Sequence, residues 1–280
     1  MTAKILDGRL SASALLDEVR TRVAGLDFRP CLATVLVGDD PASHTYVRMK
    51  ARRAEDVGIT SRRIELPHTT TSEELIGVIG DLSSDPDVHG ILLQHPVPPH
   101  IDERAAFDAI APSKDVDGVT SASFAAMALG HAGFRSCTPG GIMRLLEDYE
   151  ISSTGKHAVV VGRSPILGLP VGMLLLAADA TVTYCHSRTV DLALRVAEAD
   201  IVVAAVGRAR LIQGDWIKPG AVVVDAGYNG AVGDVDYAGA LERASWITPV
   251  PGGVGPMTIA VLLDQTVRAA YSARTEATSS

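Results

Sequence analysis

Four polar residues in the first half of the chain could take part in catalysis, and two of them lie four positions apart. Tyr46 and Lys50 therefore share one face of a predicted helix. Gln94 follows the apolar run Gly90–Leu93, which places an amide beyond the carboxyl end of a predicted strand, where open α/β sheets bind ligands. Asp117 lies in a polar turn. These side chains suit general acid–base chemistry or the alignment of a substrate for hydride transfer, although a single helical lysine or turn aspartate is also typical of solvated surface.

A second group of candidate residues lies where a dinucleotide would bind. The apolar run Ala158–Val161 leads into the loop Gly162–Pro170 and then a helix, an order that presents backbone N–H groups to a phosphate. The spacing is neither GxGxxG nor a P-loop, so tight packing remains the alternative. The next strand ends at Ser187 and Arg188, where an enzyme for NAD would carry an acid. A hydroxyl and a guanidinium, together with Arg163 from the loop, favour the 2'-phosphate of NADP.

Composition excludes several other classes of function. The 280 residues carry a net charge of −8 without any long block of Lys and Arg, so neither nucleic acid nor an anionic membrane is an expected partner. The eight histidines form no HExxH motif and no zinc-type pairing with cysteine, so no metal is expected. The three cysteines are widely spaced, no apolar signal run is present, and no segment offers roughly 18 apolar residues. These features predict a cytoplasmic protein.

The elements that must position these residues follow from the alternation of apolar and amphipathic segments. Six apolar runs predict buried parallel strands, at Leu32–Val37, Gly90–Leu93, Ala158–Val161, Ala180–Tyr184, Ile201–Val206 and Ala221–Val224. Amphipathic patterns predict helices at Ser11–Leu26, Tyr46–Val57, Glu73–Leu82, Gly140–Tyr149, Pro170–Ala177 and Thr258–Ala270. Strands that alternate with helices indicate an α/β fold with parallel sheets.

The chain is long enough to form two domains. We place the boundary near Ser136–Gly141, where the proline and two glycines of Thr138–Gly141 break the chain before a helix and a second strand–helix series. The expected fold is an N-terminal α/β catalytic domain over residues 1–139 and a Rossmann-like domain over residues 140–255. A C-terminal helix within residues 256–280 is expected to pack back on the first domain. The polar end Ser272–Ser280 is expected to be frayed.

Taken together, the motifs resemble one family, the bifunctional methylenetetrahydrofolate dehydrogenase/methenyltetrahydrofolate cyclohydrolases of one-carbon metabolism. The tyrosine–lysine pair and a long Pro/Gly-rich segment are the most specific of them. The matching segments occur in the order of the family and span nearly the whole chain: Val37–Ser43, Tyr46–Lys50, Gly90–Gln94, Lys114–Gly118, Cys137–Gly141, Gly162–Ser164, Cys185–Thr189 and Thr248–Thr258.

The resemblance implies an NADP-dependent oxidation of 5,10-methylenetetrahydrofolate to 5,10-methenyltetrahydrofolate, followed by hydrolysis to 10-formyltetrahydrofolate. It implies that folate binds on the first domain and NADP on the second, in a homodimer that serves purine biosynthesis. By the same resemblance, Lys50 carries the proton of the hydrolytic step and Gln94 orients it. Tyr46 and Asp117 would bind the folate and complete the catalytic set.

The other site residues are carried over from the resemblance in the same way. Three residues of a tight turn would also contact the substrate: Pro251, Gly252 and Gly253. Six residues would line the NADP site: Gly162, Arg163, Ser164, Ser187, Arg188 and Tyr228.

Two positions of the cofactor loop depart from the family pattern. Pro165 lacks a backbone N–H, and Leu169 stands where a basic residue is usual. The loss of donors could weaken or alter the binding of the dinucleotide. The alternatives that stay open are an enzyme of the same fold that uses NAD or has only one of the two activities, a folate-sensing or scaffolding paralogue with a dead site, and an unrelated two-domain dehydrogenase that acts on a small acid.

Overall fold

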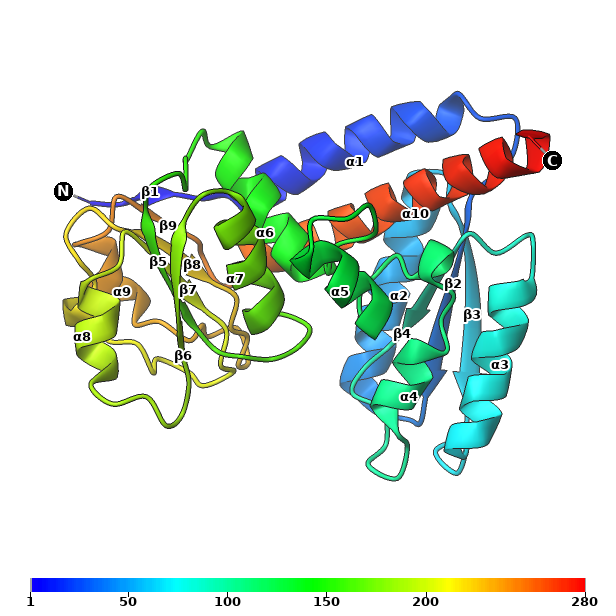
Figure 1. Cartoon of the computed structure of the whole chain (residues 1–280), viewed down its shortest axis with the longest axis horizontal. Coiled ribbons are helices and arrows are strands. Elements are labelled where there is room, and N and C mark those ends of the chain that lie inside the picture. The colour runs from blue at the N-terminus through cyan, green and yellow to red at the C-terminus, as the bar shows by residue number, and fades with distance from the viewer. Residues whose placement is uncertain (1, 280) are drawn as a thin grey trace. The chain divides into compact units, whose positions relative to one another are not determined.

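The computed structural model describes residues 2–279. It consists of two compact units (Figure 1): unit 1 contains Met1–Ser13 and Cys137–Thr258, and unit 2 contains Ala14–Ser136 and Ile259–Ser280. Each unit is an α/β structure built on a parallel sheet, which confirms the predicted fold class. Neither unit is continuous in sequence.

Unit 2 is built on a three-stranded sheet in the order β3-β2-β4. Its strands are β2 (Cys31–Val37), β3 (Thr60–Leu66) and β4 (Gly90–Leu93). The connecting helices are α2 (Pro41–Asp56), α3 (Ser72–Ser84), α4 (Glu103–Asp108), η1 (Pro112–Lys114) and α5 (Ser121–Ala128). Strands β2 and β4 are apolar and buried, as predicted. The sequence pattern did not predict β3, because its polar residues form an edge strand with much of its surface exposed.

Helix α2 begins at Pro41, earlier than the predicted Tyr46. The Asp40 carboxylate accepts the backbone N–H of Ser43 at 2.8 Å, and the proline fills the first helical position. The same hydrogen bond holds the pKa of Asp40 below its usual range. This cap fixes the start of the helix that carries Tyr46 and Lys50.

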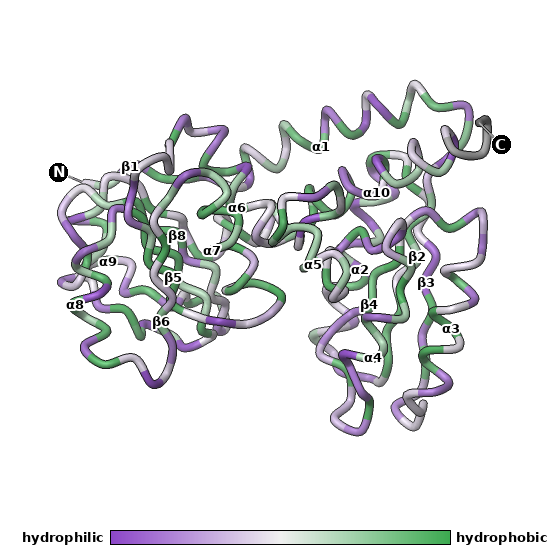
Figure 2. The backbone as a smooth tube through the Cα atoms, in the orientation of Figure 1, coloured by the Kyte–Doolittle hydropathy of each residue, from purple (hydrophilic) through white to green (hydrophobic). Residues whose placement is uncertain are grey.

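Unit 1 is built on a six-stranded parallel sheet in the order β1-β9-β8-β7-β5-β6. The strands are β1 (Lys4–Ile5), β5 (His157–Val161), β6 (Thr181–Cys185), β7 (Ile201–Ala204), β8 (Val222–Asp225) and β9 (Trp246–Ile247). Its shorter helices are α7 (Gly168–Ala177), α8 (Leu192–Ala197), η2 (Gly214–Trp216) and α9 (Tyr237–Leu241). The central strands form the hydrophobic interior of the unit, as their green colour in Figure 2 shows. Strand β6 is added on one side of β5, and the later strands β7, β8 and β9 are added on the other side, so the strand order reverses at β5.

The predicted chain break at Thr138–Gly141 is wrong, because these residues lie in the first turns of α6 (Cys137–Asp148). A proline is compatible with the first turn of a helix, where its missing N–H would have no intrahelical acceptor. An added Cβ on Gly141 would lie 2.9 Å from the Met257 Cβ. This glycine therefore serves close packing rather than a turn.

Two helices contain residues of both units, α1 (Gly8–Ala24) and α10 (Val254–Ser279). Within unit 2 their later turns lie side by side (Figure 1), where the Arg22 guanidinium pairs with Asp264. The return of the C-terminal helix to the first half of the chain is as predicted. Helix α10 extends to Ser279, and the frayed end at Ser272–Ser280 stays a prediction. None of the described helices has an apolar stretch long enough to cross a bilayer.

Candidate active site

Lys50 and Gln94 are joined by a hydrogen bond in unit 2. The Lys50 ammonium donates to Gln94 Oε1 at 3.0 Å. Gln94 is buried, its side-chain nitrogen donates to the His95 carbonyl at 2.8 Å, and its backbone N–H donates to Val35 O. Both ends of the amide are engaged, so its oxygen faces the lysine. An ammonium held in this way on a half-buried helix face can exchange a proton with a bound substrate or water.

Tyr46 lies one helical turn before Lys50 on α2. It is 40% exposed, which is unusual for a large aromatic side chain and leaves its ring accessible to a ligand. The predicted sharing of one helix face follows from the four-residue spacing within a continuous helix.

Asp117 lies in a loop between η1 and α5 that is held from three sides. The buried Asp115 carboxylate accepts the backbone N–H groups of Val119 at 3.1 Å and Thr120 at 2.9 Å, and burial raises the pKa of Asp115. Gly118 has a φ of +65°, and an added Cβ there would lie 2.4 Å from the carbonyl carbon of Arg135. The loop is therefore fixed, with the Asp117 side chain half-buried.

Gln265 of α10 anchors the same loop. Its side-chain nitrogen donates to Val116 O at 2.8 Å and Arg135 O at 2.9 Å, and its oxygen accepts Arg135 N–H at 3.0 Å. Sequence reasoning missed Asp115 and Gln265. The only sequence signal for Asp115 is its place two residues before Asp117, and nothing in the sequence distinguishes Gln265 from other polar residues of the predicted C-terminal helix.

The loop that follows β5 in unit 1 is tightly packed. Gly162 has a φ of +134°, and an added Cβ would lie 2.1 Å from Ala205 O. An added Cβ on Gly168, the first residue of α7, would lie 2.5 Å from the Gly162 carbonyl carbon. Both glycines are therefore required by close backbone approach. The loop occupies the carboxyl edge of the sheet at the reversal of strand order, which is where ligands bind in such sheets.

The side chains at this edge suit a dinucleotide with an additional phosphate. Arg163 and, at the end of β6, Ser187 and Arg188 are exposed, and no carboxylate occupies the last two positions. Ser164 is turned inward in part, because its Oγ accepts Ile166 N–H at 3.3 Å. Pro165 itself is exposed. Guanidinium groups beside a glycine cradle at a helix start fit the phosphates of NADP.

The remaining predicted residues of unit 1 lie in two other loops. Tyr228, between β8 and α9, is 57% exposed. Pro251 is exposed, Gly252 has a φ of +115°, and an added Cβ on Gly253 would lie 2.6 Å from Thr248 Cβ. This turn thus needs its glycines for conformation and space.

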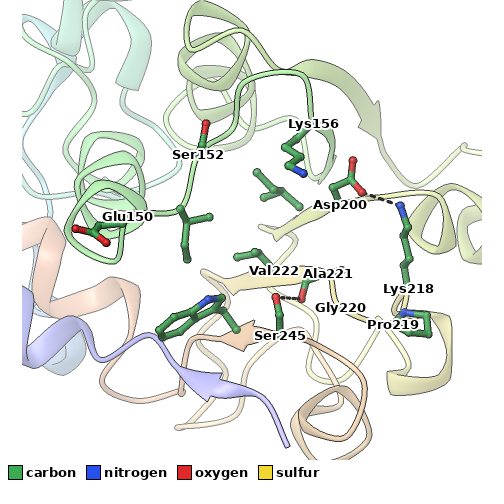
Figure 3. Close-up of a pocket in the computed structure, with 13 residues that line it drawn as sticks. Glu150, Ser152, Lys156, Asp200, Lys218, Pro219, Gly220, Ala221, Val222 and Ser245 are labelled. Carbon is green, nitrogen blue, oxygen red and sulfur yellow. Dashed lines mark hydrogen bonds and ion pairs between the residues drawn. The ribbon is translucent and has the colours of Figure 1, made fainter. Parts of the chain in front are cut away.

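A separate hollow lies at the amino edge of the unit 1 sheet (Figure 3), and none of the predicted site residues lines it. Lys218 Nζ lies 2.7 Å from Asp200 Oδ1, and this hydrogen bond holds the pKa of Asp200 below its usual range. Ser245 Oγ donates to Ala221 O at 3.3 Å. Because these polar groups pair with each other, we assign the hollow no catalytic role.

Two family models match the chain. Residues 6–117 match the catalytic domain of tetrahydrofolate dehydrogenase/cyclohydrolase, and residues 136–274 match the NAD(P)-binding domain of the same enzyme. The chain is 68% identical over 275 residues to Bifunctional protein FolD 1 of Salinispora arenicola. The matched region covers 96% of this chain and 99% of that protein.

Solved structures agree with the sequence comparison. The bifunctional FolD enzyme of Campylobacter jejuni superposes with a TM-score of 0.95 at 43% identity, covering 96% of this chain and 99% of that one. The Trypanosoma brucei dehydrogenase–cyclohydrolase, solved with NADP and an inhibitor, gives 0.93 at 39% identity, covering 98% and 99%. The chain therefore belongs to the tetrahydrofolate dehydrogenase/cyclohydrolase family. The family and the enzyme class expected from the sequence are confirmed.

Proposed function

We propose that this chain oxidises 5,10-methylenetetrahydrofolate to 5,10-methenyltetrahydrofolate with NADP and hydrolyses the product to 10-formyltetrahydrofolate. The observation that carries the proposal is the 3.0 Å hydrogen bond between Lys50 Nζ and Gln94 Oε1 in a chain of this family. It supplies a proton-carrying group whose orientation is set by a second side chain.

In the hydrolytic step, water adds to the methenyl carbon and loses one proton to the solvent. The bond from that carbon to N5 then breaks as the hydroxyl proton of the adduct is transferred to N5, which leaves the formyl group on N10. Lys50 moves that proton, and Gln94 keeps its ammonium in place. Tyr46 packs on the folate ring with its exposed face. The Asp117 carboxylate accepts the N–H donors of the aminopyrimidine edge. Pro251, Gly252 and Gly253 remain predicted substrate contacts.

In the oxidative step, the residues of unit 1 bind and align the dinucleotide. Gly162 and Ser164 would border the phosphates through the backbone cradle. The Arg163 and Arg188 guanidinium groups would neutralise the 2'-phosphate, and the Ser187 hydroxyl would donate a hydrogen bond to it. Tyr228 offers an exposed ring at the same edge of the sheet. Bound NADP supplies the hydride acceptor, and the protein contributes alignment. We assign the catalytic domain to residues 1–139 with the returning helix 256–280 and the cofactor domain to residues 140–255, with the exception that strand β1 pairs with β9 in the sheet of unit 1.

The enzyme is further proposed to be a cytoplasmic homodimer that supplies formyl groups for purine biosynthesis. Its cysteines in the described chain are free thiols, which suits a reducing compartment. Sedimentation equilibrium of the purified chain tests the assembly: a mass of twice 29.3 kDa is expected, and a single-chain mass would exclude the dimer.

The test of the function is spectrophotometric. Purified protein receives methylenetetrahydrofolate with NADP or NAD in turn, and reduced cofactor and methenyl intermediate are followed together. Reduction with NADP, and loss of the methenyl form faster than its spontaneous hydrolysis, support both activities. Reduction with NAD alone would refute the cofactor assignment. Hydrolysis of added methenyl substrate without any reduction would mean that the loop around Pro165 and Leu169 has lost the dehydrogenase.

A further inference from the structure

A fully buried carboxylate in unit 1 binds three consecutive backbone amides. Asp234 is 0% exposed. Its Oδ2 accepts the N–H groups of Val206 at 2.7 Å and Gly207 at 2.9 Å, and its Oδ1 accepts that of Arg208 at 2.8 Å. Successive N–H groups that converge in this way form an anion-binding nest. Here the nest is filled by the protein's own negative charge.

The same carboxylate reaches a second loop, between β8 and α9. The Asn229 side-chain nitrogen donates to Asp234 Oδ1 at 3.2 Å, directly beside Tyr228. An added Cβ on Gly227 would lie 2.2 Å from the carboxyl carbon of Asp234. The glycine thus leaves the space that the carboxylate occupies. Asp234 thereby connects the loop after β7 to the loop after β8.

The first of these loops lies against the glycine cradle. Ala205, which precedes the nest, places its carbonyl oxygen 2.1 Å from where a Cβ on Gly162 would be. Its backbone N–H donates to Val161 O at 2.8 Å. The nest residues therefore continue from a segment that is packed directly on the loop after β5.

We infer that Asp234 is a positioning residue of the cofactor site: it holds residues 206–208 and the Tyr228–Asn229 turn at the border of the Gly162 loop. The inference rests on the proposed function, because it takes the Gly162 loop as the place where NADP binds. Without the carboxylate, three adjacent N–H donors would be left without their acceptor at the edge of the sheet, and both loops would lose their common anchor.

The experiment replaces Asp234 by asparagine, which keeps the shape but puts an amide nitrogen against backbone N–H donors. NADP binding is measured by titration calorimetry, and amide hydrogen exchange is followed at Val206–Arg208. Hydrolysis of methenyltetrahydrofolate, which uses no cofactor, is assayed in parallel. Asp236→Asn is the matched control. It removes a carboxylate two residues from Asp234, and the Asp236 side chain accepts no hydrogen bond from an N–H group of the helix that follows it.

We expect Asp234→Asn to weaken NADP binding by at least about tenfold and to speed exchange at the three amides by a similar factor, the scale of an unsatisfied buried donor. Hydrolysis and the Asp236→Asn control should stay within about twofold of wild type. If Asp234→Asn does not fold, Asn229→Ala should weaken NADP binding by about threefold, since it removes the hydrogen bond to Asp234 together with a longer one to Val232 O.

Three results would overturn the inference. A folded Asp234→Asn or Asn229→Ala protein that binds NADP as wild type does would refute it alone. Equal loss of NADP binding and hydrolysis in a folded variant would show a general structural role instead. If the wild-type protein binds no NADP, both the proposed function and the inference are refuted. This outcome differs from a failure of the inference alone, in which the wild type binds NADP.

Discussion

At the scale of single residues, Lys50 depends on an amide that has only one favourable orientation. Gln94 donates from its nitrogen to the His95 carbonyl, so a flipped amide would lose that bond and turn its NH₂ group toward the ammonium. Gln94 is 7% exposed, and water therefore gives little compensation for such a loss. The lysine is positioned by geometry as well as by charge.

Replacing Lys50 by methionine should separate the two activities. The variant keeps most of the side-chain length and loses the proton carrier, so hydrolysis of methenyltetrahydrofolate should fall by about 100-fold or more. Oxidation with NADP should persist, and methenyl intermediate should accumulate in the coupled assay. Arg52→Met, which removes a positive charge from an exposed position of the same helix, should leave both rates within about twofold. Unchanged hydrolysis in Lys50→Met would exclude Lys50 as the proton carrier.

The site residues themselves could be proposed from the sequence, but the residues that support them could not. Tyr46, Lys50 and Gln94 have recognisable spacing and follow recognisable elements. Asp234 and Asp225 lie among glycines in a segment that has the composition of a surface turn, yet both are buried. A glycine that makes room for a carboxylate has the same sequence signature as a glycine that makes a turn.

At the scale of elements, helix α7 and strand β6 fit together through one pair of residues. An added Cβ on Gly172 would lie 2.3 Å from the Tyr184 hydroxyl oxygen. That hydroxyl donates to Leu169 O in the first turn of α7 at 2.8 Å, and burial raises its pKa. The tyrosine ring fills the space left by the missing side chain. The pair sets how the first turn of α7, next to the Gly162 loop, lies on the sheet.

Gly172→Ala should therefore destabilise the protein although alanine favours helices. The forced contact with the ring should lower the free energy of unfolding by about 1–3 kcal/mol, measured by urea denaturation. Adding Tyr184→Val should recover part of the loss. Gly77→Ala is the control: it lies within α3 with nothing within 4 Å of the added Cβ, and should stabilise by about 0.5–1 kcal/mol. Additive effects of the Gly172 and Tyr184 changes would show that the two residues are not coupled.

Most of the elements could be predicted, and the failures have physical causes. The buried strands of both sheets have long apolar runs, which are visible without the structure. Edge strand β3 has polar residues such as Arg62 and Glu65, while β1 and β9 contain two residues each and have no period to detect. The proline and glycines of α6 have the composition of a turn. The reason for Gly141 is its close packing on Met257, and the sequence does not show this contact because Met257 is distant in the chain.

At the scale of the whole molecule, acid should destabilise the fold by protonating carboxylates whose charged form is stabilised in the folded state. The Lys218 ammonium lowers the pKa of Asp200 below its value in the unfolded chain, which is about 3.9. The unfolded state therefore binds the proton more readily. The stabilising contribution of this group is complete above the unfolded pKa and is lost as the pH falls through the folded pKa.

Asp200→Asn should make the protein less sensitive to acid. An amide oxygen can still accept the His157 N–H, which Asp200 binds at 2.9 Å, so the change removes mainly the charge. The Lys218 and Asp200 side chains are 44% and 33% exposed, so the effect of the pair on stability should stay below about 1 kcal/mol. Urea midpoints at pH 7 and pH 3 should differ less in Asp200→Asn than in wild type, and Lys218→Met should reduce the difference as well. An unchanged pH dependence in both variants would exclude the pair as a source of acid sensitivity.

The pairing of β1 with β9 has a consequence for the chain during its synthesis. Lys4 lies opposite Trp246 in the finished sheet, so the first strand leaves the ribosome roughly 240 residues before its partner exists. At bacterial and eukaryotic elongation rates this corresponds to a delay on the order of 12–50 s. Unit 2 likewise lacks its share of α10 until Ile259 and the residues after it have been synthesised. Both units therefore wait for segments that are made late, and the early apolar segments of the nascent chain stay without these partners during that interval.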